Sequence, residues 1–215
     1  MGILRGAEGC TALIPVTRQP EPATFAPNVR NPGSAFLRRL RKRPTRDEFN
    51  RKNFWTRALP DLFSIYRSIC AYSASWIPSA AQASVDHFHP KSRRPDLAYE
   101  WSNYRLATKE MNSNKGDATD ILDPFALQLG WFILDMDSFH IKPNGGLPPS
   151  LVEAIRHTIT VLKLNHDAYV TMRFEIVRDY SKADVTLDYI QRRFPFIASE
   201  LVRQNLTTTI FGTMK

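Results

Sequence analysis

Three stretches decide how the centre of this chain folds: residues 85–92 (VDHFHPKS), residues 101–106 (WSNYRL) and residues 111–116 (MNSNKG). Pro90 cannot donate to a strand ladder, so a strand that holds Asp86 and His87 ends close to His87. The spacing then leaves room for a loop, a return strand over residues 104–107 and one helix that carries Asn112. We therefore expect a strand, a loop, a second strand and a helix, in that order.

Helical patterns flank this centre on both sides. Thr45 and Glu48 form a capping-box pattern, which predicts a helix over residues 46–58, and a second helix is expected over residues 61–72. Further helices are expected over residues 150–164, 167–180 and 183–193. With only one small β element in the middle, the sequence predicts a mostly helical α+β fold.

The chain is expected to have three parts. Prolines and the lack of any helical or strand period predict an extended arm, which with a basic segment makes up residues 1–44. Residues 45–125 form the core, and residues 126–215 form a C-terminal helical subdomain packed on that core. The basic segment, residues 36–43 (FLRRLRKR), has two interpretations: a patch that contacts phosphates, or a solvated helical turn.

Composition limits the class of protein. The chain has 215 residues, of which 43% are hydrophobic, enough for a packed core. No apolar run approaches the roughly 20 residues of a membrane span, and the first residues are too polar for a secretory signal. We therefore expect a cytoplasmic protein without a membrane partner. The net charge of +8 favours a polyanionic partner.

The central stretches carry residue types suited to phosphodiester cleavage. That reaction needs a divalent metal on hard oxygen ligands and a base that titrates near neutral pH. Asp86 offers a carboxylate oxygen, Asn112 an amide oxygen and His87 a base. Neighbours on a strand point to opposite faces, so Asp86 and His87 share a site only if the strand ends or twists there. Asn103 is expected to fix the loop through bonds to its backbone.

Four cations are expected to surround this site and bind a phosphate substrate: Lys91, Arg93, Arg94 and Lys115. Two neighbouring residues leave alternatives open. His89 is either a third ligand or an ordinary loop histidine. Asn114 competes with Asn112 but lies about 200° from it around a helix, so both cannot face one metal.

The spacing D-H-x-x-P-K-S, W-x-N and N-x-x-K-G resembles the motif of HNH (ββα-metal) endonucleases. The resemblance implies that Asp86 and Asn112 hold Mg²⁺ or Mn²⁺ and that His87 is the general base. Asn103 takes the place of the middle residue of the motif, and Lys115 follows at the family's position.

The resemblance extends beyond the motif, over roughly residues 55 to 180. Residues 122–124 (LDP), Gly130, residues 158–165 (TITVLKLN) and Arg173 are similar to the HNH subunits of bacterial anti-phage systems, the Septu and retron-associated proteins. Those subunits act beside an ABC-type ATPase. The likeness implies an effector nuclease that cuts DNA, an ATPase partner, and assembly as a homodimer or a hetero-complex.

One departure from the family concerns zinc. Many HNH proteins bind a structural zinc through two cysteine pairs, whereas this chain has only Cys10 and Cys70, and no pair flanks Asn112. We therefore expect no structural zinc and assign Cys70 to the core. Two alternatives remain open. The first is an adaptor that binds nucleic acid or docks on an ATPase without catalysis. The second stays within the enzyme class and is a nuclease that nicks only one strand or cuts RNA.

Overall fold

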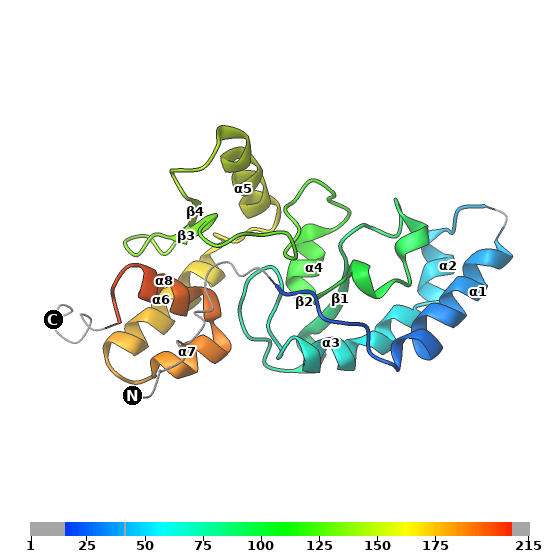
Figure 1. Cartoon of the computed structure of the whole chain (residues 1–215), viewed down its shortest axis with the longest axis horizontal. Helices are drawn as coiled ribbons and strands as arrows, with labels where there is room; N and C mark the ends of the chain where they lie inside the picture. Colours follow the sequence, from blue (N-terminus) through cyan, green and yellow to red (C-terminus); the bar gives the residue numbers. More distant parts are fainter. Residues whose placement is uncertain (1–15, 41, 208–215) are drawn as a thin grey trace, which may run out of the picture.

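The computed structural model describes residues 16–40 and 42–207, and within them the chain is a mostly helical α+β protein, as predicted (Figure 1). The helices are α1 (Asn31–Arg39), α2 (Arg46–Arg51), α3 (Leu59–Ile65), α4 (Lys109–Lys115), α5 (Pro149–Val161), α6 (Asp167–Ser181), α7 (Leu187–Arg193) and α8 (Pro195–Arg203). The strands are β1 (Ala83–His87), β2 (Tyr104–Thr108), β3 (Phe132–Leu134) and β4 (Ile141–Pro143). They form two separate antiparallel pairs, β1–β2 and β3–β4.

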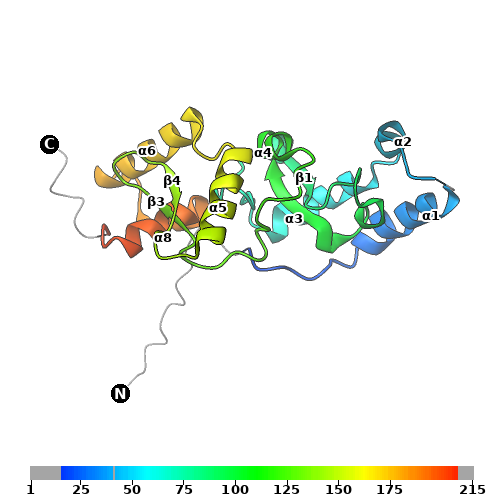
Figure 2. The same cartoon turned by 90° about the horizontal axis from the view of Figure 1, so that it is seen from above.

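The elements fall into two groups along the long axis of the molecule (Figures 1 and 2). The first group holds α1 to α4 and the β1–β2 pair, and the second holds the β3–β4 pair and α5 to α8. One cluster of buried apolar side chains runs through both groups, from Phe25 and Val29 to Leu164 and Phe196. A smaller cluster joins α6, α7 and α8. In the described residues, no helix combines the length and apolar character needed to cross a membrane.

The β1–β2 pair and α4 follow one another as predicted, and we call them the ββα element. In the antiparallel register, Asp86 lies opposite Arg105 and His87 lies opposite Tyr104. Opposed residues of two paired strands point to the same face. Asp86 and Arg105 therefore share one face of the pair, and His87 and Tyr104 share the other.

The helix of this element has clear local boundaries. Thr108 ends β2 and caps α4, because its side chain accepts the Met111 N–H. Gly116 follows α4 with a positive φ of 52°, which side-chain-bearing residues rarely adopt, and its N–H bonds to the Asn112 carbonyl. These two signals place a helix of seven residues directly after the return strand.

The helices before the strands are shorter than predicted. The capping box of Thr45 and Glu48 is present and starts α2, but α2 ends at Arg51, and residues 54–58 form a 3₁₀ helix. The second helix was expected to reach residue 72, yet α3 ends at Ile65. The backbone turns there because Arg67 and Ser68 adopt the left-handed conformation.

The prediction of an extended arm is wrong for residues 26–39, which are helical. Residues 26–30 form a π-helical turn that continues into α1, and Phe25 and Val29 are buried in the core. Pro27 and Pro32 do not oppose this, because each lies in the first two positions of a helical segment, where no intrahelical N–H is required. Residues 1–15 and Arg41 lie outside the described residues.

The C-terminal region is helical as expected, with shifted boundaries. α5 begins at Pro149, has no side-chain cap, and ends at Val161, so it covers most of the helix expected over residues 150–164. α6 agrees closely with its prediction, whereas α7 starts only after Thr186, whose hydroxyl caps it. α8 was not expected from the sequence.

Candidate active site in the ββα element

Asp86 and His87 end β1 and project to opposite faces of it. The Asp86 carboxylate contacts the Lys115 ammonium of α4 at 3.1 Å. The His87 ring instead meets the edges of Trp55 and Tyr104, with ring centroids 5.2 Å and 5.1 Å away. β1 ends at His87, as the sequence predicts, and the Lys115 ammonium also donates to the His87 carbonyl at 2.8 Å. The two residues are thus joined through Lys115, although their side chains diverge.

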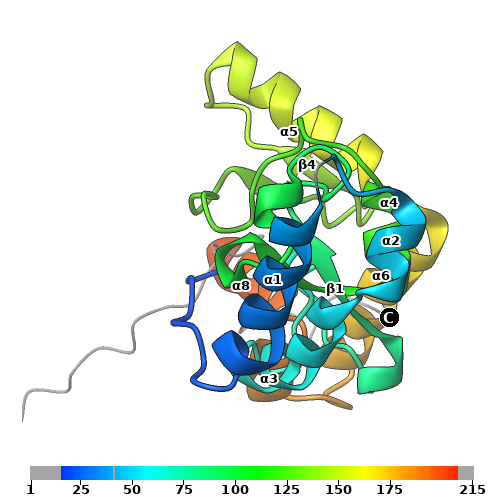
Figure 3. The ribbon, with the colours of Figure 1, turned by 90° about the vertical axis from the view of Figure 1, so that its right-hand side faces the viewer.

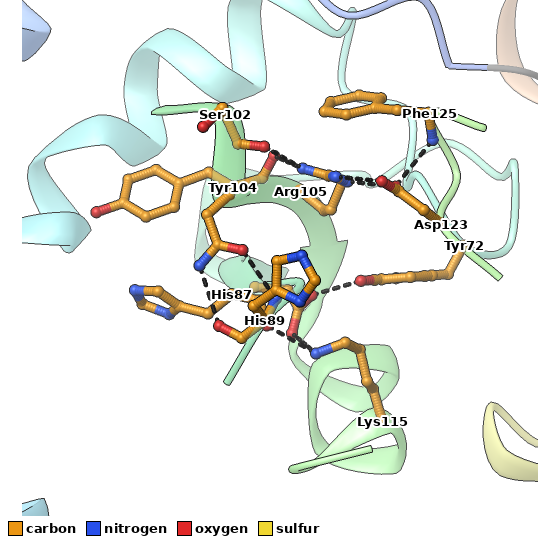
Figure 4. Close-up of polar contacts among 11 residues, drawn as sticks. Tyr72, His87, His89, Ser102, Tyr104, Arg105, Lys115, Asp123 and Phe125 are labelled. Atoms are coloured by element: carbon orange, nitrogen blue, oxygen red, sulfur yellow. Dashed lines mark hydrogen bonds and ion pairs between the residues drawn. The ribbon is translucent and has the colours of Figure 1, made fainter. Parts of the chain in front are cut away.

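The Asp86 carboxylate is held between two side chains from distant parts of the sequence. It is only 1% exposed. The Tyr72 hydroxyl donates to Oδ2 at 2.5 Å and Lys115 donates to Oδ1 (Figure 4). Burial raises the pKa of Asp86 above its ordinary value, while the positive charge of Lys115 and the bond from Tyr72 act in the opposite direction.

A second buried ion pair lies on the same face. The Arg105 guanidinium, opposite Asp86 in register, donates to both oxygens of Asp123 at 2.9 Å and 2.8 Å (Figure 4). It also lies 3.6 Å from the centre of the Phe125 ring and 5.0 Å from that of Phe88. Sequence reasoning missed this pair and Tyr72. The sequence signal that could have revealed the ion pair is an arginine within a predicted strand, between Tyr104 and Leu106.

His87 has one fixed nitrogen and one free one. Its Nε2 lies 2.9 Å from the Ala98 carbonyl oxygen. A carbonyl can only accept, so Nε2 carries the proton and Nδ1 has the lone pair. Burial, and secondarily the charge of Lys91, lowers the pKa of His87 to about 3. The ring is therefore neutral at neutral pH, with a base nitrogen at Nδ1.

Asn103 fixes the loop between the two strands, as predicted. Its Oδ1 accepts from the His89 N–H at 2.8 Å, and its Nδ2 donates to the carbonyls of His89 at 3.0 Å and Leu97 at 3.1 Å. Both ends of the amide are used, and the side chain is buried. The His89 ring is exposed, and its backbone is what Asn103 binds. Asn103 thus acts on the loop that surrounds His87.

Asn112 lies on the face of α4 that packs against β1. Its Nδ2 donates to the Ser84 hydroxyl at 2.7 Å. Ser84 and Asp86 are two residues apart and share a face of β1, while Asn112 and Lys115 are three apart and share a face of α4. Asn112 therefore belongs to the same helix–strand contact as Asp86, without a direct bond between them. Asn114 points elsewhere and bonds weakly to the Leu162 carbonyl at 3.4 Å.

The donor set at this contact suits a hard divalent cation. A carboxylate oxygen and an amide oxygen are ligands that Mg²⁺ and Mn²⁺ prefer, and two protein ligands leave positions for water and phosphate. In this arrangement, the Lys115 ammonium is the countercharge of Asp86. A metal ion bound at the Asp86 carboxylate would therefore either share the carboxylate with Lys115 or displace the Lys115 ammonium. Within residues 16–40 and 42–207, no group of three histidine, cysteine or acidic residues is placed to hold a metal. Cys70 is fully buried in the core.

The four predicted phosphate-binding cations differ in their exposure and in their ion-pair partners. Lys115 is fully buried at Asp86, so its predicted exposure to substrate is corrected. Arg94 is exposed but forms an ion pair with Asp96 at 2.6 Å. Arg93 is exposed and makes no ion pair within the described chain. Lys91 is partly buried, with its ammonium 4.9 Å from the centre of the Trp55 ring.

Comparison with known proteins adds nothing to this geometry: no family model matches the chain, and no curated protein matches it either.

Proposed function

We propose that this protein is a metal-dependent HNH endonuclease that hydrolyses DNA phosphodiester bonds. One observation carries the proposal. On a single ββα element, a neutral histidine with its Nε2 fixed by a backbone carbonyl is next to a carboxylate that faces the helix carrying Asn112. Phosphodiester hydrolysis requires a base and a hard ligand set, and here they come from neighbouring residues at the end of β1 and from α4.

Each residue of the site has a distinct role in this proposal. Asp86 and Asn112 hold the cation, which when bound supplies positive charge for the scissile phosphate and its leaving oxygen. His87 takes a proton from the attacking water at Nδ1. A phosphate beside the ring favours the imidazolium and so acts against the lowered pKa of His87. Asn103 keeps the loop in place, and Lys91 and Arg93 bind the substrate.

The resemblance in sequence also supports a biological setting. We propose that the chain is the effector nuclease of a bacterial anti-phage system, in the cytoplasm, beside an ABC-type ATPase. Residues 122–124 and 158–165 and the buried Arg173 carry that part of the likeness. Arg173 donates to the carbonyls of Phe139 and Leu164, which joins α6 to the β3–β4 region.

A non-catalytic adaptor is the second candidate, and two observations favour it. The Lys115 ammonium already neutralises Asp86, and burial lowers the pKa of His87 to about 3, which makes it a weak base. An adaptor built on this element would bind nucleic acid or an ATPase without turnover.

Plasmid cleavage separates the two candidates. The wild type and the variants His87→Ala and His166→Ala are incubated with supercoiled plasmid and Mg²⁺ or Mn²⁺, with EDTA as the metal control. We expect nicking or linearisation by the wild type and by His166→Ala, whose side chain is exposed and distant in sequence. His87→Ala is expected to lose at least about 100-fold in rate. No cleavage by the wild type, alone and with its ATPase, would establish the adaptor.

A further inference from the structure

A run of exposed cations lies along the end of α1, the loop after it, α2 and the 3₁₀ helix of residues 54–58. In the described part of residues 38–57, eight basic side chains are exposed and none makes an ion pair: Arg38, Arg39, Lys42, Arg43, Arg46, Arg51, Lys52 and Arg57. The same stretch holds only two acidic residues, and one of them, Glu48, is engaged in the capping box. We call this surface the basic face.

The basic face continues to the rim of the candidate site. The Arg43 guanidinium donates to the Arg93 carbonyl in the loop that Asn103 fixes. Burial is the main cause that lowers the pKa of Lys91, and the charge of Arg46 acts in the same direction, so these two cations lie within electrostatic reach of each other. Lys91 in turn lies over Trp55, whose ring meets His87. Figure 2 shows α1 and α2 together at one end of the molecule, on the side of β1, and Figure 3 looks onto that end.

Unpaired like charges that lie close together repel one another. A polyanion that lies along the face would remove that repulsion and release counterions. Two kinds of polyanion are large enough to contact the whole face: the phosphate backbone of a nucleic acid and an anionic membrane.

The distribution of apolar side chains distinguishes these two partners. A membrane-binding surface combines cations with exposed large apolar residues that enter the lipid. Among the described residues, the exposed large apolar side chains are Leu129, just before β3, Phe174 on α6 and Val202 on α8. The basic face has none of them, so it suits a phosphate backbone.

We propose that the basic face binds the backbone of duplex DNA and leads it to the ββα element. The choice of DNA rests on the proposed nuclease function. The binding surface itself rests on the exposed cations of α1 and α2 and on their contact with the loop of Lys91 and Arg93. Binding along the basic face would extend the DNA contacts well beyond the cations next to Asp86 and His87.

Two charge-matched triple variants test the proposal. One is Arg39→Gln, Lys42→Gln and Arg46→Gln on the basic face. The other is Arg156→Gln, Lys163→Gln and Lys182→Gln in the second group. All six side chains are exposed and without an ion pair, so neither triple removes a bond that holds the fold. Thermal melts monitored by circular dichroism check that both variants are folded.

Binding is measured with a fluorescent duplex of random sequence in EDTA, at several salt concentrations. For the basic-face triple, we expect Kd at 0.1 M salt to rise on the order of 100-fold, and the slope of log Kd against log salt to fall by about 2 to 3. The control triple is expected to stay close to the wild type in both quantities. An equal loss in both triples, or no loss in the first, overturns the proposal.

Vesicles containing phosphatidylserine provide the competing partner. We expect neither the wild type nor the triples to co-sediment with them at 0.1 M salt. Vesicle binding that is lost in the basic-face triple, while duplex binding is unchanged, assigns the face to a membrane and contradicts the proposal. Because EDTA prevents metal-dependent cleavage, the binding assay is independent of turnover. Duplex binding through this face, with no cleavage in Mg²⁺ by the chain alone or with its ATPase, would refute the nuclease function and leave this inference standing.

Discussion

Two buried carboxylates, one in each group of elements, are held in different ways. Glu200 on α8 is 2% exposed, and its oxygens accept from the Leu134 N–H at 2.7 Å and from Arg203 and Gln204, close to it on or just after the same helix. Asp86 is equally buried, but its partners are a tyrosine hydroxyl and a buried ammonium, with no backbone N–H.

The hydrogen-bond donors of these two carboxylates distinguish a structural carboxylate from a functional one. Glu200 joins α8 to β3 through a backbone group, and its charge is shared with Arg203, which is 45% exposed. Asp86 accepts from two side chains and from no backbone N–H. It keeps one donor on each oxygen, which leaves lone pairs for another ligand. We therefore treat Glu200 as part of the frame and Asp86 as part of the chemistry.

The largest expected contrast is in plasmid cleavage. Asp86→Asn should reduce the rate at least about 1000-fold, because removing a metal-binding carboxylate removes several kcal/mol of transition-state stabilisation. Glu200→Gln should remain within about twofold of the wild type per folded molecule. Rates are measured from supercoiled plasmid at a temperature where both variants are folded. Comparable losses in the two variants would erase the distinction between the carboxylates.

The next contrast is in stability and involves Lys115. Lys115→Met leaves Asp86 buried without its countercharge and should lower the free energy of unfolding by about 3–5 kcal/mol. The double variant Asp86→Asn with Lys115→Met should recover most of that loss, because no unpaired charge then remains buried. Urea unfolding measures all three proteins together with Asp86→Asn. Additive losses in the double variant would mean that the two side chains do not act as a pair.

A third prediction concerns Asn103, which binds backbone groups as Glu200 does, but beside the candidate site. Asn103→Ala should cost about 2–3 kcal/mol, because an N–H and two carbonyls lose their partner, and it should also slow cleavage by loosening the loop around His87. Asn114→Ala, which removes one weak bond, is the matched control. Urea unfolding and cleavage rates are compared. If Asn103→Ala cut plasmid at the wild-type rate, the loop would not position the site.

The smallest expected effect is the pH dependence of stability from His87. Its pKa is lowered to about 3 in the folded protein against an ordinary 6.5, so between these values the unfolded chain binds the proton and the folded chain does not. The neutral ring thus contributes fully above pH 6.5, and stability falls as the pH falls below it. From pH 7 to pH 5, we expect a loss of about 2 kcal/mol in the free energy of unfolding.

The control for this prediction is a second histidine. His87→Gln should reduce the loss between pH 7 and pH 5, whereas His166→Gln, whose side chain is exposed, should retain it. Urea unfolding at the two pH values gives the comparison. The same pH dependence in the wild type and in His87→Gln would assign the effect to other groups.

The sequence allowed the ββα element to be predicted because its determinants are local. Pro90, the spacing to Asn112 and the short amide of Asn103 act within about 30 residues, and the strand limits and the loop bonds agree with the structure. The partners of Asp86 could not be predicted from the sequence. Tyr72 and Lys115 contact its carboxylate only in the folded chain, and a local pattern of residue types does not indicate which distant side chain will bind a buried charge.

The errors outside this element have similar causes. The prolines predict an extended arm, but proline is tolerated at the start of a helix, and the burial of Phe25 and Val29 stabilises the helical turn. The predicted helix over residues 61–72 ended early, because Arg67 and Ser68 adopt a left-handed backbone for which these residue types give no warning.

Metal binding in the absence of DNA is the sharpest test of whether Asp86 is a metal ligand. Isothermal titration of Mn²⁺ into the wild type, Asp86→Asn and Glu200→Gln requires neither substrate nor turnover. We expect one Mn²⁺ site per chain in the wild type and in Glu200→Gln, and no site in Asp86→Asn. Absence of Mn²⁺ binding in the wild type, or equal binding in Asp86→Asn, would contradict it.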